Sequence, residues 1–280
     1  MRTWLWLFLC PLAVAGCGGD GSSESDSAQF PAAGSAGIDC SAWSRAGDAT
    51  TMDGARWTYQ STDDGVRFQL SGVLFTPAGS GPFPGVVVSH GRGGNAAGYS
   101  SSVARIMRDW GLVAIATNYT HAPDDIDATL LPQGAEGASP ENVQRAHKTR
   151  ELLSCLGIVD MDRLAAHGHS MGAFVTGQLL GRHPQDFTAA SHTAGGLGAT
   201  GSSATTADAA AMIITPYQLH HGDADVVVDL GLDQALRDMM EESGVPHELH
   251  VYGAYTHSDI ALDPQMFERV RAWYQEHGVL

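Results

Sequence analysis

The chain has 280 residues, with 15 basic and 31 acidic side chains and a formal net charge of -16 at pH 7. This excess of negative charge argues against nucleic acid and against anionic membrane surfaces as electrostatic partners. Hydrophobic residues make up 43% of the chain and charged residues 16%, and no segment repeats at a fixed period. We therefore expect one α/β domain with a sizeable core.

The amino-terminal residues are predicted to direct export. Residues 1–16 are interpreted as a signal peptide, because Arg2 precedes an apolar stretch that is too short to span a bilayer. The four residues that end at Cys17 resemble a bacterial lipobox, whose cysteine receives the lipid. Ala13 and Ala15 also fit an ordinary cleavage site, which leaves simple secretion open. We expect an extracytoplasmic protein that is either secreted or anchored, periplasmic or on the cell surface, through Cys17 alone.

Residues 17–39 are rich in Gly, Ser, Asp and Ala and are predicted to be a flexible tether. The folded domain is expected over residues 40–280. Two cysteines belong to it, Cys40 and Cys155. In an oxidising compartment they can form a disulfide, whereas two buried free thiols fit the sequence equally well.

Apolar segments alternate with helical patterns in the way that a mostly parallel sheet requires. The series opens with an antiparallel hairpin, whose strands at 57–60 and 68–75 flank a turn at 63–65. A start signal at Ser139 and Pro140 begins a helix that Gly157 ends. The expected order after the hairpin is strand 86–88, helix 97–110, strand 112–116, helix 140–156, strand 163–166, helix 171–182, strands 187–192 and 217–221, helix 230–243, strand 248–251 and a helix from Pro264.

A GxSxG pentapeptide occupies residues 168–172, between the strand expected at 163–166 and the following helix. Small residues on both sides let a serine stand on a sharp, strained turn that exposes its Oγ beside an amide donor. The pentapeptide therefore predicts that Ser170 is a nucleophile. The alternative is a serine that only caps the helix beginning at Met171.

Candidates for a base and an acid follow Ser170 in the chain. A serine hydroxyl needs a histidine to accept its proton and a carboxylate to orient that histidine. His257 stands on the loop before the last helix, from which it can reach over the carboxyl edge of the sheet. Asp223, Asp225 and Asp229 compete for the role of acid, because all three lie in the turn after strand 217–221.

Four segments resemble, in the expected order, the α/β hydrolases, and most of all the dienelactone hydrolase family and the related cutinase-like polyester hydrolases. They are residues 90–94 (HGRGG), 168–172 (GHSMG), 221–227 (HGDADVV) and 256–258 (THS). The resemblance runs from about Phe68 to the end of the chain. It implies a catalytic domain over residues 40–280 with a mostly parallel central sheet, an antiparallel amino-terminal hairpin and helices on both faces.

The resemblance also implies roles for single residues. The acid of the family stands three residues after a glycine and just before an apolar pair, which selects Asp225 over Asp223. The backbone N–H groups of Arg92 and Met171 are expected to form the oxyanion hole. The guanidinium of Arg92 either holds a substrate carboxylate or is simply solvated.

Substrate contacts are expected from loops at the carboxyl ends of the strands. The candidate side chains are Tyr119, His121, His169 and His192. Residues 195–211 contain few large apolar side chains, so an open loop is expected there and no large cap domain. The histidine pairs of the chain predict no metal site, because no Cys or carboxylate ligand spacing accompanies them.

The resemblance implies a serine carboxylesterase that uses Ser170, Asp225 and His257, forms an acyl-enzyme and needs no metal or organic cofactor. The amino-terminal signal adds the expectation of export. Dienelactone hydrolases proper carry a cysteine nucleophile, so Ser170 favours a carboxylesterase over dienelactone chemistry. The expected substrate is a small or polymeric ester. A cutinase-like polyester hydrolase and a noncatalytic surface lipoprotein that retains the fold are the alternatives.

Overall fold

The computed structural model describes residues 38–63, 66–120, 122, 136–198 and 204–280. The predicted signal peptide, the lipidation site at Cys17, the tether as far as residue 37 and His121 lie outside these residues and stay predictions. Within the described ranges, every helix is too short or too polar to cross a bilayer.

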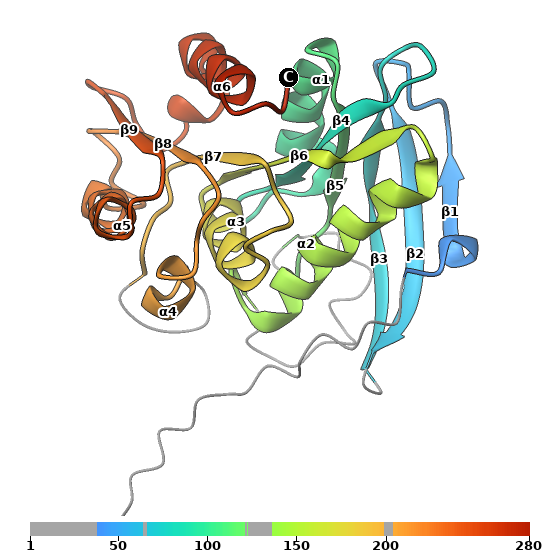
Figure 1. Cartoon of the computed structure of the whole chain (residues 1–280), viewed down its shortest axis with the longest axis horizontal. Coiled ribbons are helices and arrows are strands. Elements are labelled where there is room, and N and C mark those ends of the chain that lie inside the picture. The colour runs from blue at the N-terminus through green and yellow to red at the C-terminus, as the bar shows by residue number, and fades with distance from the viewer. Residues whose placement is uncertain (1–37, 64–65, 121, 123–135, 199–203) are drawn as a thin grey trace, which may run out of the picture. The chain divides into compact units, whose positions relative to one another are not determined.

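The core of the fold is a nine-stranded sheet with the order β1-β2-β3-β5-β4-β6-β7-β8-β9 (Figure 1). Strands β1, β2, β3 and β5 pair antiparallel, and all pairs from β5 to β9 are parallel. The strands are β1 (Trp43–Ala46), β2 (Ala55–Asp63), β3 (Val66–Phe75), β4 (Phe83–Ser89), β5 (Val113–Thr117), β6 (Val159–His169), β7 (Ala189–Thr193), β8 (Tyr217–Gly222) and β9 (His247–Tyr252).

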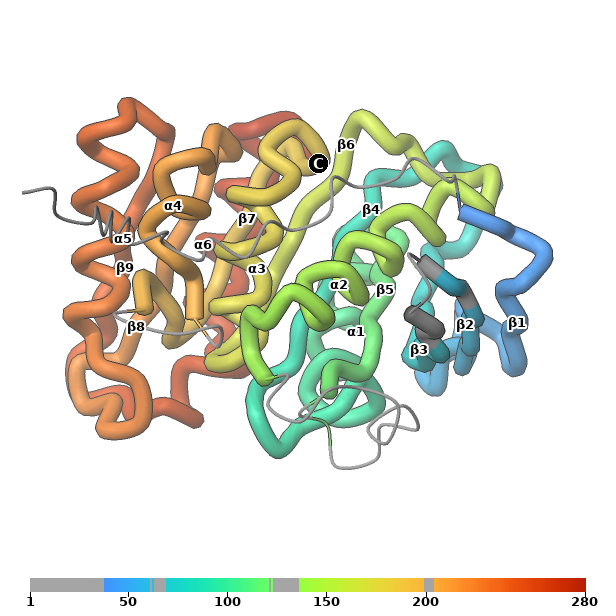
Figure 2. The backbone as a smooth tube through the Cα atoms, turned by 90° about the horizontal axis from the view of Figure 1, so that it is seen from below, coloured from blue at the N-terminus to red at the C-terminus, as the bar shows by residue number. Residues whose placement is uncertain are grey.

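Helices cover both faces of this sheet. Helices α1 and α6 lie on one face, and Figure 2 shows α2, α3 and α5 along the other. The helices are α1 (Ser101–Asp109), α2 (Pro140–Leu152), α3 (Met171–Arg182), α4 (Ala207–Ala210), α5 (Leu230–Ser243) and α6 (Pro264–Glu276). Short helical turns are η1 (Cys40–Ala42), η2 (Ala96–Ser100), η3 (Leu153–Leu156) and η4 (Ile260–Leu262).

The valine run of β4 explains why both faces must be covered. Successive side chains of a strand point to opposite faces, so Val87 joins the apolar cluster under α2, α3 and α5, while Val86 and Val88 join the cluster under α1 and α6. All three are at most 1% exposed. A strand that is apolar on both sides is typical of a parallel sheet between two layers of helices.

Most sequence predictions of elements are confirmed. Helices α3 and α5 begin and end where the apolar pattern placed them. The side chain of Ser139 caps α2 by accepting from the N–H of Asn142, and Gly157 takes a left-handed conformation, with φ of 65°, after η3. The mostly parallel sheet with an antiparallel amino-terminal part confirms the predicted fold class.

Three local expectations are corrected. Strand β1 was not predicted, and it forms the sheet edge by pairing with β2. The single helix expected at 97–110 is a π-helical turn, η2, followed by α1, because Gly98 has non-helical angles (φ -87°, ψ -107°). The expected open loop at 195–211 contains α4 in its described part, where Ala209 is 2% exposed. The small residue Gly181 permits this packing, since a Cβ there would lie 2.1 Å from O of Ala209.

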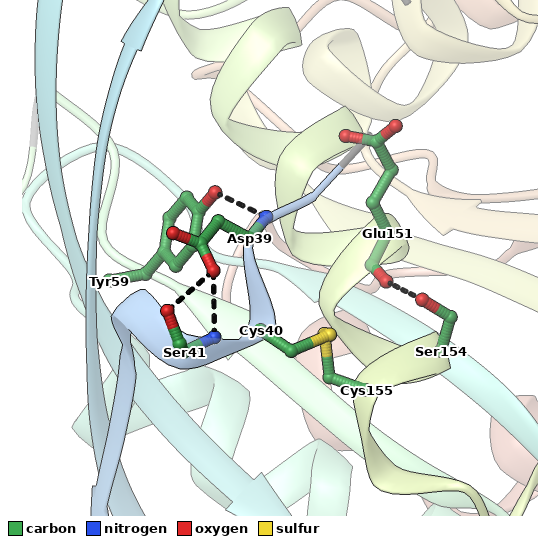
Figure 3. The surroundings of a disulfide bond; sticks show 7 residues. All are labelled: Asp39, Cys40, Ser41, Tyr59, Glu151, Ser154 and Cys155. Carbon is green, nitrogen blue, oxygen red and sulfur yellow. Dashed lines mark hydrogen bonds between the residues drawn. A yellow bond between two sulfur atoms is a disulfide. The ribbon is translucent and has the colours of Figure 1, made fainter. Parts of the chain in front are cut away.

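A disulfide joins Cys40 of η1 to Cys155 of η3, 115 residues apart in the chain (Figure 3). The bond decides between the two readings that the sequence left open for these cysteines. It ties the amino-terminal edge of the sheet to the end of the α2 segment.

Candidate active site

Ser170 lies at the junction of β6 and α3, in a backbone conformation that side chains rarely adopt (φ 57°, ψ -122°). The surrounding glycines make this turn possible. A Cβ at Gly168 would lie 2.2 Å from O of Gly172, and a Cβ at Gly172 would lie 2.3 Å from O of Ser89. Both contacts are with backbone atoms that cannot move aside, so only glycine fits. The strained conformation is held by its neighbours, as is usual for functional residues.

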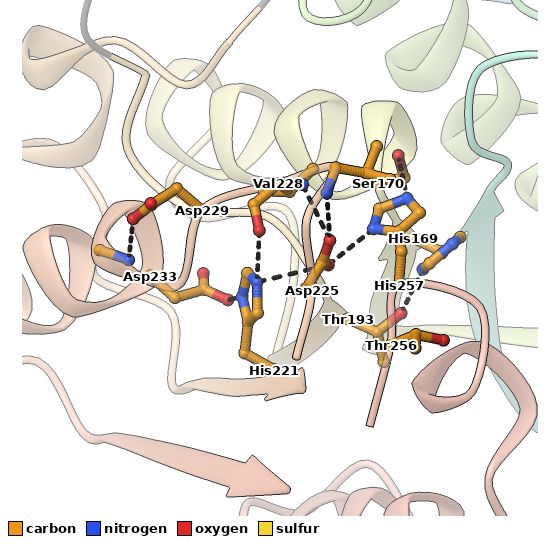
Figure 4. Close-up of polar contacts among 12 residues, drawn as sticks. His169, Ser170, Thr193, His221, Asp225, Val228, Asp229, Asp233, Thr256 and His257 are labelled. Carbon is orange, nitrogen blue, oxygen red and sulfur yellow. Dashed lines mark hydrogen bonds and ion pairs between the residues drawn. The ribbon is translucent and has the colours of Figure 1, made fainter. Parts of the chain in front are cut away.

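Ser170, His257 and Asp225 form one hydrogen-bonded path, called the triad below (Figure 4). Oγ of Ser170 lies 2.9 Å from Nε2 of His257, and Nδ1 of His257 lies 2.7 Å from Oδ2 of Asp225. In this geometry Nδ1–H donates to the carboxylate, which leaves Nε2 free to accept the proton of the hydroxyl. The three residues come from the β6–α3 turn, the loop after β8 and the loop after β9.

Asp225 is held rigidly in place. Its Oδ1 accepts hydrogen bonds from the N–H groups of Val227 at 2.8 Å and Val228 at 2.9 Å, which leaves Oδ2 for His257. Burial would raise the pKa of Asp225, but the Val228 amide and the His257 ring outweigh it, so that the pKa lies below its ordinary value. The carboxylate is therefore ionised at neutral pH.

The two rival carboxylates have other contacts. Asp223 accepts the N–H of Ala254 at 2.6 Å, where Ala254 has a positive φ of 65°. Asp229 caps α5 by accepting the N–H of Gly231 at 2.7 Å. Within the described ranges, Asp225 is the member of this group whose side chain meets His257.

The two residues predicted to supply oxyanion-hole amides, Met171 and Arg92, belong to segments that adjoin Ser170. Met171 is the first residue of α3, where an N–H has no partner within the helix. A Cβ at Gly91 would lie 3.2 Å from Cβ of Ser170, so the loop that carries Arg92 passes directly beside Ser170. The guanidinium of Arg92 contacts Glu136 at 2.6 Å in an exposed ion pair.

His90 holds this loop in place, a role that the sequence analysis did not assign. Its Nδ1 donates to O of Gly91 at 2.9 Å, and its Nε2 accepts the N–H of Tyr119 at 3.1 Å. Burial lowers the pKa of His90 to about 4, so the ring is neutral and both hydrogen bonds persist at neutral pH. Its position in the HGRGG segment is the signal that could have indicated this role.

The structure corrects part of the expected substrate pocket. Tyr119 and His192 are fully buried, so neither presents a surface to a substrate. The hydroxyl of Tyr119 lies 2.7 Å from Oγ of Ser89, and Nε2 of His192 lies 2.6 Å from Oδ1 of Asp233. Both side chains point into the layers beneath the carboxyl edge of the sheet, a direction that strand ends do not reveal in sequence.

His169 lies beside the triad, as expected for a pocket candidate. Its ring centroid is 4.8 Å from that of His257, and its Nδ1 is 2.9 Å from Oγ1 of Thr193. Burial, together with the neighbouring His257, lowers the pKa of His169 to about 3. A neutral imidazole therefore packs against the ring of His257.

One cluster of metal-ligand residue types lies apart from these residues. Ligand atoms of His147, His183 and Asp186 lie within 4.8 Å of one another. The two rings stack in nearly parallel planes, with centroids 3.7 Å apart, so their nitrogen lone pairs cannot both point at one ion without a rotation. Arg150 lies 3.7 Å from Asp186 and already supplies a positive charge. We assign no metal to this cluster.

Comparison with known proteins agrees with this architecture. Residues 70–273 match the sequence profile of the dienelactone hydrolase family, and no curated protein gives a significant match. Among solved structures, the chain is similar to a dienelactone hydrolase-like promiscuous phosphotriesterase from metagenomic libraries, with a TM-score of 0.63, 22% identity and coverage of 79% of this chain and 98% of that chain.

Two further solved structures share the fold. An S-formylglutathione hydrolase from Agrobacterium tumefaciens has a TM-score of 0.59 and 17% identity, over 84% of this chain and 99% of that chain. A cold-adapted esterase from an Arctic intertidal metagenomic library has a TM-score of 0.61 and 16% identity, over 81% and 95%. Because the family profile covers well over half of the residues, the chain belongs to the dienelactone hydrolase family.

Proposed function

We propose that the protein is a serine hydrolase that cleaves carboxylic ester bonds. The observation that carries the proposal is the continuous path from Oγ of Ser170 through His257 to Asp225. Ester hydrolysis agrees with membership of a hydrolase family and with the esterase among the structures of similar fold.

The reaction would proceed in two halves. His257 accepts the proton of Ser170 while Oγ attacks the ester carbonyl carbon, and the imidazolium then gives this proton to the departing alcohol. The N–H groups of Arg92 and Met171 would stabilise the negative oxygen of each tetrahedral intermediate. Water then attacks the acyl-enzyme, with His257 again as base, and releases the carboxylic acid and free Ser170.

The surface next to the triad favours an ester with an apolar part. Val226 is 96% exposed and Val227 is 67% exposed, and both follow Asp225 directly in the chain. Two adjacent exposed apolar side chains beside the triad offer an apolar surface to a bound ester. The same pair could contact an apolar stretch of a polymer, which makes a polyester the second candidate substrate.

The test is turnover of short-chain p-nitrophenyl esters together with labelling by a fluorophosphonate. Wild-type protein should hydrolyse the esters and carry the label on Ser170. The Ser170→Ala variant should lose at least about 10³-fold in kcat/KM and all labelling, because the nucleophile is gone. If folded wild-type protein neither hydrolyses the esters nor reacts with the fluorophosphonate, the noncatalytic alternative replaces this proposal.

A further inference from the structure

A second carboxylate, Asp233 of α5, lies completely buried behind the triad and carries a histidine on each oxygen. Oδ1 lies 2.6 Å from Nε2 of His192, and Oδ2 lies 2.6 Å from Nδ1 of His221. All three side chains have no exposed surface. A buried carboxylate costs free energy unless a positive charge or hydrogen bonds compensate it. The net charge of this group of side chains therefore depends on whether the two histidines are protonated.

The contacts of His221 require protons on both ring nitrogens. Nε2 lies 3.0 Å from the carbonyl oxygen of Val228, which can only accept, so Nε2 carries a hydrogen. Nδ1 faces Asp233, and a single proton lies between them. Burial lowers the pKa of His221, but Asp233 outweighs it and raises the pKa above its ordinary value. The proton between the two groups therefore belongs to His221, which is an imidazolium.

His192 needs no charge. Within the described residues the recorded partner of the Tyr217 hydroxyl is Nδ1 of His192, so the hydroxyl donates there and Nε2–H donates to Asp233. Burial would raise the pKa of Asp233, but the two histidines hold it at about 2. Asp233, His192 and His221, called the assembly below, thus contain one negative group, Asp233, and one positive group, His221.

The positive end of this pair faces the triad. Nε2 of His221 lies 3.5 Å from Oδ2 of Asp225, the oxygen that accepts from His257, and Figure 4 shows His221 between the two carboxylates. Asp225 lies beside His221, Tyr217 contacts His192, and His257 lies beyond Asp225. The further titratable neighbours on the side of His192 and Tyr217 are His167, His169, His220 and Tyr274. Of these neighbours, His169 is neutral because of its burial.

We propose that His221 and Asp233 are positioning residues of the triad, a buried imidazolium–carboxylate pair that keeps Asp225 ionised and extends the activity of His257 to lower pH. The inference rests on the proposed function. A cation beside Asp225 stabilises the carboxylate and disfavours a second positive charge on His257.

Nitrogen NMR of protein with ¹⁵N-labelled histidine tests the charge of His221 without any measurement of activity. One imidazolium is expected to persist at pH 8, to vanish in His221→Gln and to become neutral in Asp233→Asn. A wild-type His221 that is neutral at pH 7 overturns the inference, whatever the enzyme assays give.

The pH profile of kcat/KM tests the effect on the triad. His221→Gln and Asp233→Asn should each move the acid limb upward by about one pH unit, because each removes the cation beside Asp225. The double variant should move it no further, since both changes remove the same charge. His192→Gln is the matched control, because it breaks the other bond to Asp233 without removing the cation, and its limb should stay in place.

Thermal unfolding of each variant shows whether a fall in activity comes from lost stability or from a shift of the acid limb of the kcat/KM profile. A uniform fall of kcat/KM at every pH, with the limb unmoved, would assign His221 and Asp233 to the fold alone and overturn the inference while the proposed function stands. Absence of Ser170-dependent turnover in wild-type protein would instead refute the proposed function, and the NMR result would still decide the charge of the pair.

Discussion

Asp225 differs from its neighbours Asp223 and Asp229 in its burial and in what its side chain contacts. All three are turn carboxylates within seven residues, and each accepts at least one backbone N–H. Asp225 alone among them uses its second oxygen for His257. The residue type is the same at all three positions, so the contact with His257 is what distinguishes Asp225.

Substitution of the two carboxylates tests this distinction. Asp225→Asn should lower kcat/KM by about 10³- to 10⁴-fold, because an amide no longer holds the tautomer of His257 or stabilises the imidazolium. Asp223→Asn should stay within a few-fold of wild type, since its Oδ1 can still accept the N–H of Ala254. Ester hydrolysis by both variants, with unfolding curves as the check on folding, gives the answer. Near wild-type activity of Asp225→Asn would remove it from the proposed triad.

Elements of the fold bring the site together from distant parts of the chain. Strand β6 delivers Ser170, and the loops after β8 and β9 deliver Asp225 and His257 to the same edge of the sheet. At the opposite end of the strand order, β1 is the edge strand, and β2 is its pairing partner among the described residues. The disulfide between η1 and η3 links the segment before β1 covalently to the rest of the domain.

Removal of the disulfide should affect stability and leave chemistry intact. A crosslink over 115 residues restricts the unfolded chain, so the Cys40→Ser, Cys155→Ser double variant should lose about 2 to 5 kcal/mol of unfolding free energy. Its kcat/KM should be unchanged, because none of the hydrogen bonds of the triad involves η1 or η3. Urea unfolding with and without reductant measures the effect.

Ser41→Ala is the matched control for that experiment. It removes an exposed hydroxyl beside Cys40 whose hydrogen-bond partner in the described part of the chain is Asp39, so its unfolding midpoint should stay close to that of wild type. Reductant should bring wild-type protein to the midpoint of the double variant. Equal midpoints for wild type and the double variant would show that the bond adds no stability.

At the scale of the whole molecule, several histidines are buried as neutral rings. Burial lowers the pKa of His90 to about 4 and that of His167 and His169 to about 3. His167 is satisfied without a charge, with Ser191 Oγ 2.7 Å from Nδ1 and the Tyr99 hydroxyl 3.0 Å from Nε2. The folded state therefore binds fewer protons than the unfolded state below the ordinary histidine pKa of about 6.5.

Stability should accordingly fall as the pH is lowered from about 6.5. Each of these lowered pKa values contributes stability that is fully present above the unfolded value and is lost towards the folded value. Each such histidine costs about 1.4 kcal/mol per pH unit in that window. Unfolding free energies from urea curves at pH 7.5, 6.5 and 5.5 test this.

A single substitution can show which histidine takes up one of the protons that bind on unfolding. His167→Gln should reduce the slope of unfolding free energy against pH below 6.5 by about one proton, even if the variant is less stable throughout. A stability that does not change between pH 7.5 and 5.5 contradicts the buried neutral rings.

The sequence by itself determined the local features of this protein. Apart from β1, η2 and α4, the strand and helix order follows from residues close together in the chain, and so do the caps at Ser139 and Gly157, the strained turn at Ser170 and the family segments. Their physical causes act over a few residues, namely side-chain periodicity, the missing Cβ of glycine and the hydrogen bonds of helix ends. The choice of Asp225 over Asp223 came from the family resemblance, and the contact with His257 supports it independently.

Only the tertiary structure decided which side chains meet across the fold. It joined Cys40 to Cys155, turned Tyr119 and His192 into the interior, and placed His221 between Asp233 and Asp225. Each of these contacts depends on strand register, on the face to which a side chain points and on the packing of α5 against the sheet. A one-residue change of register turns every side chain of a strand to the other face. Such contacts are set by the whole packed chain, and no local pattern in the sequence specifies them.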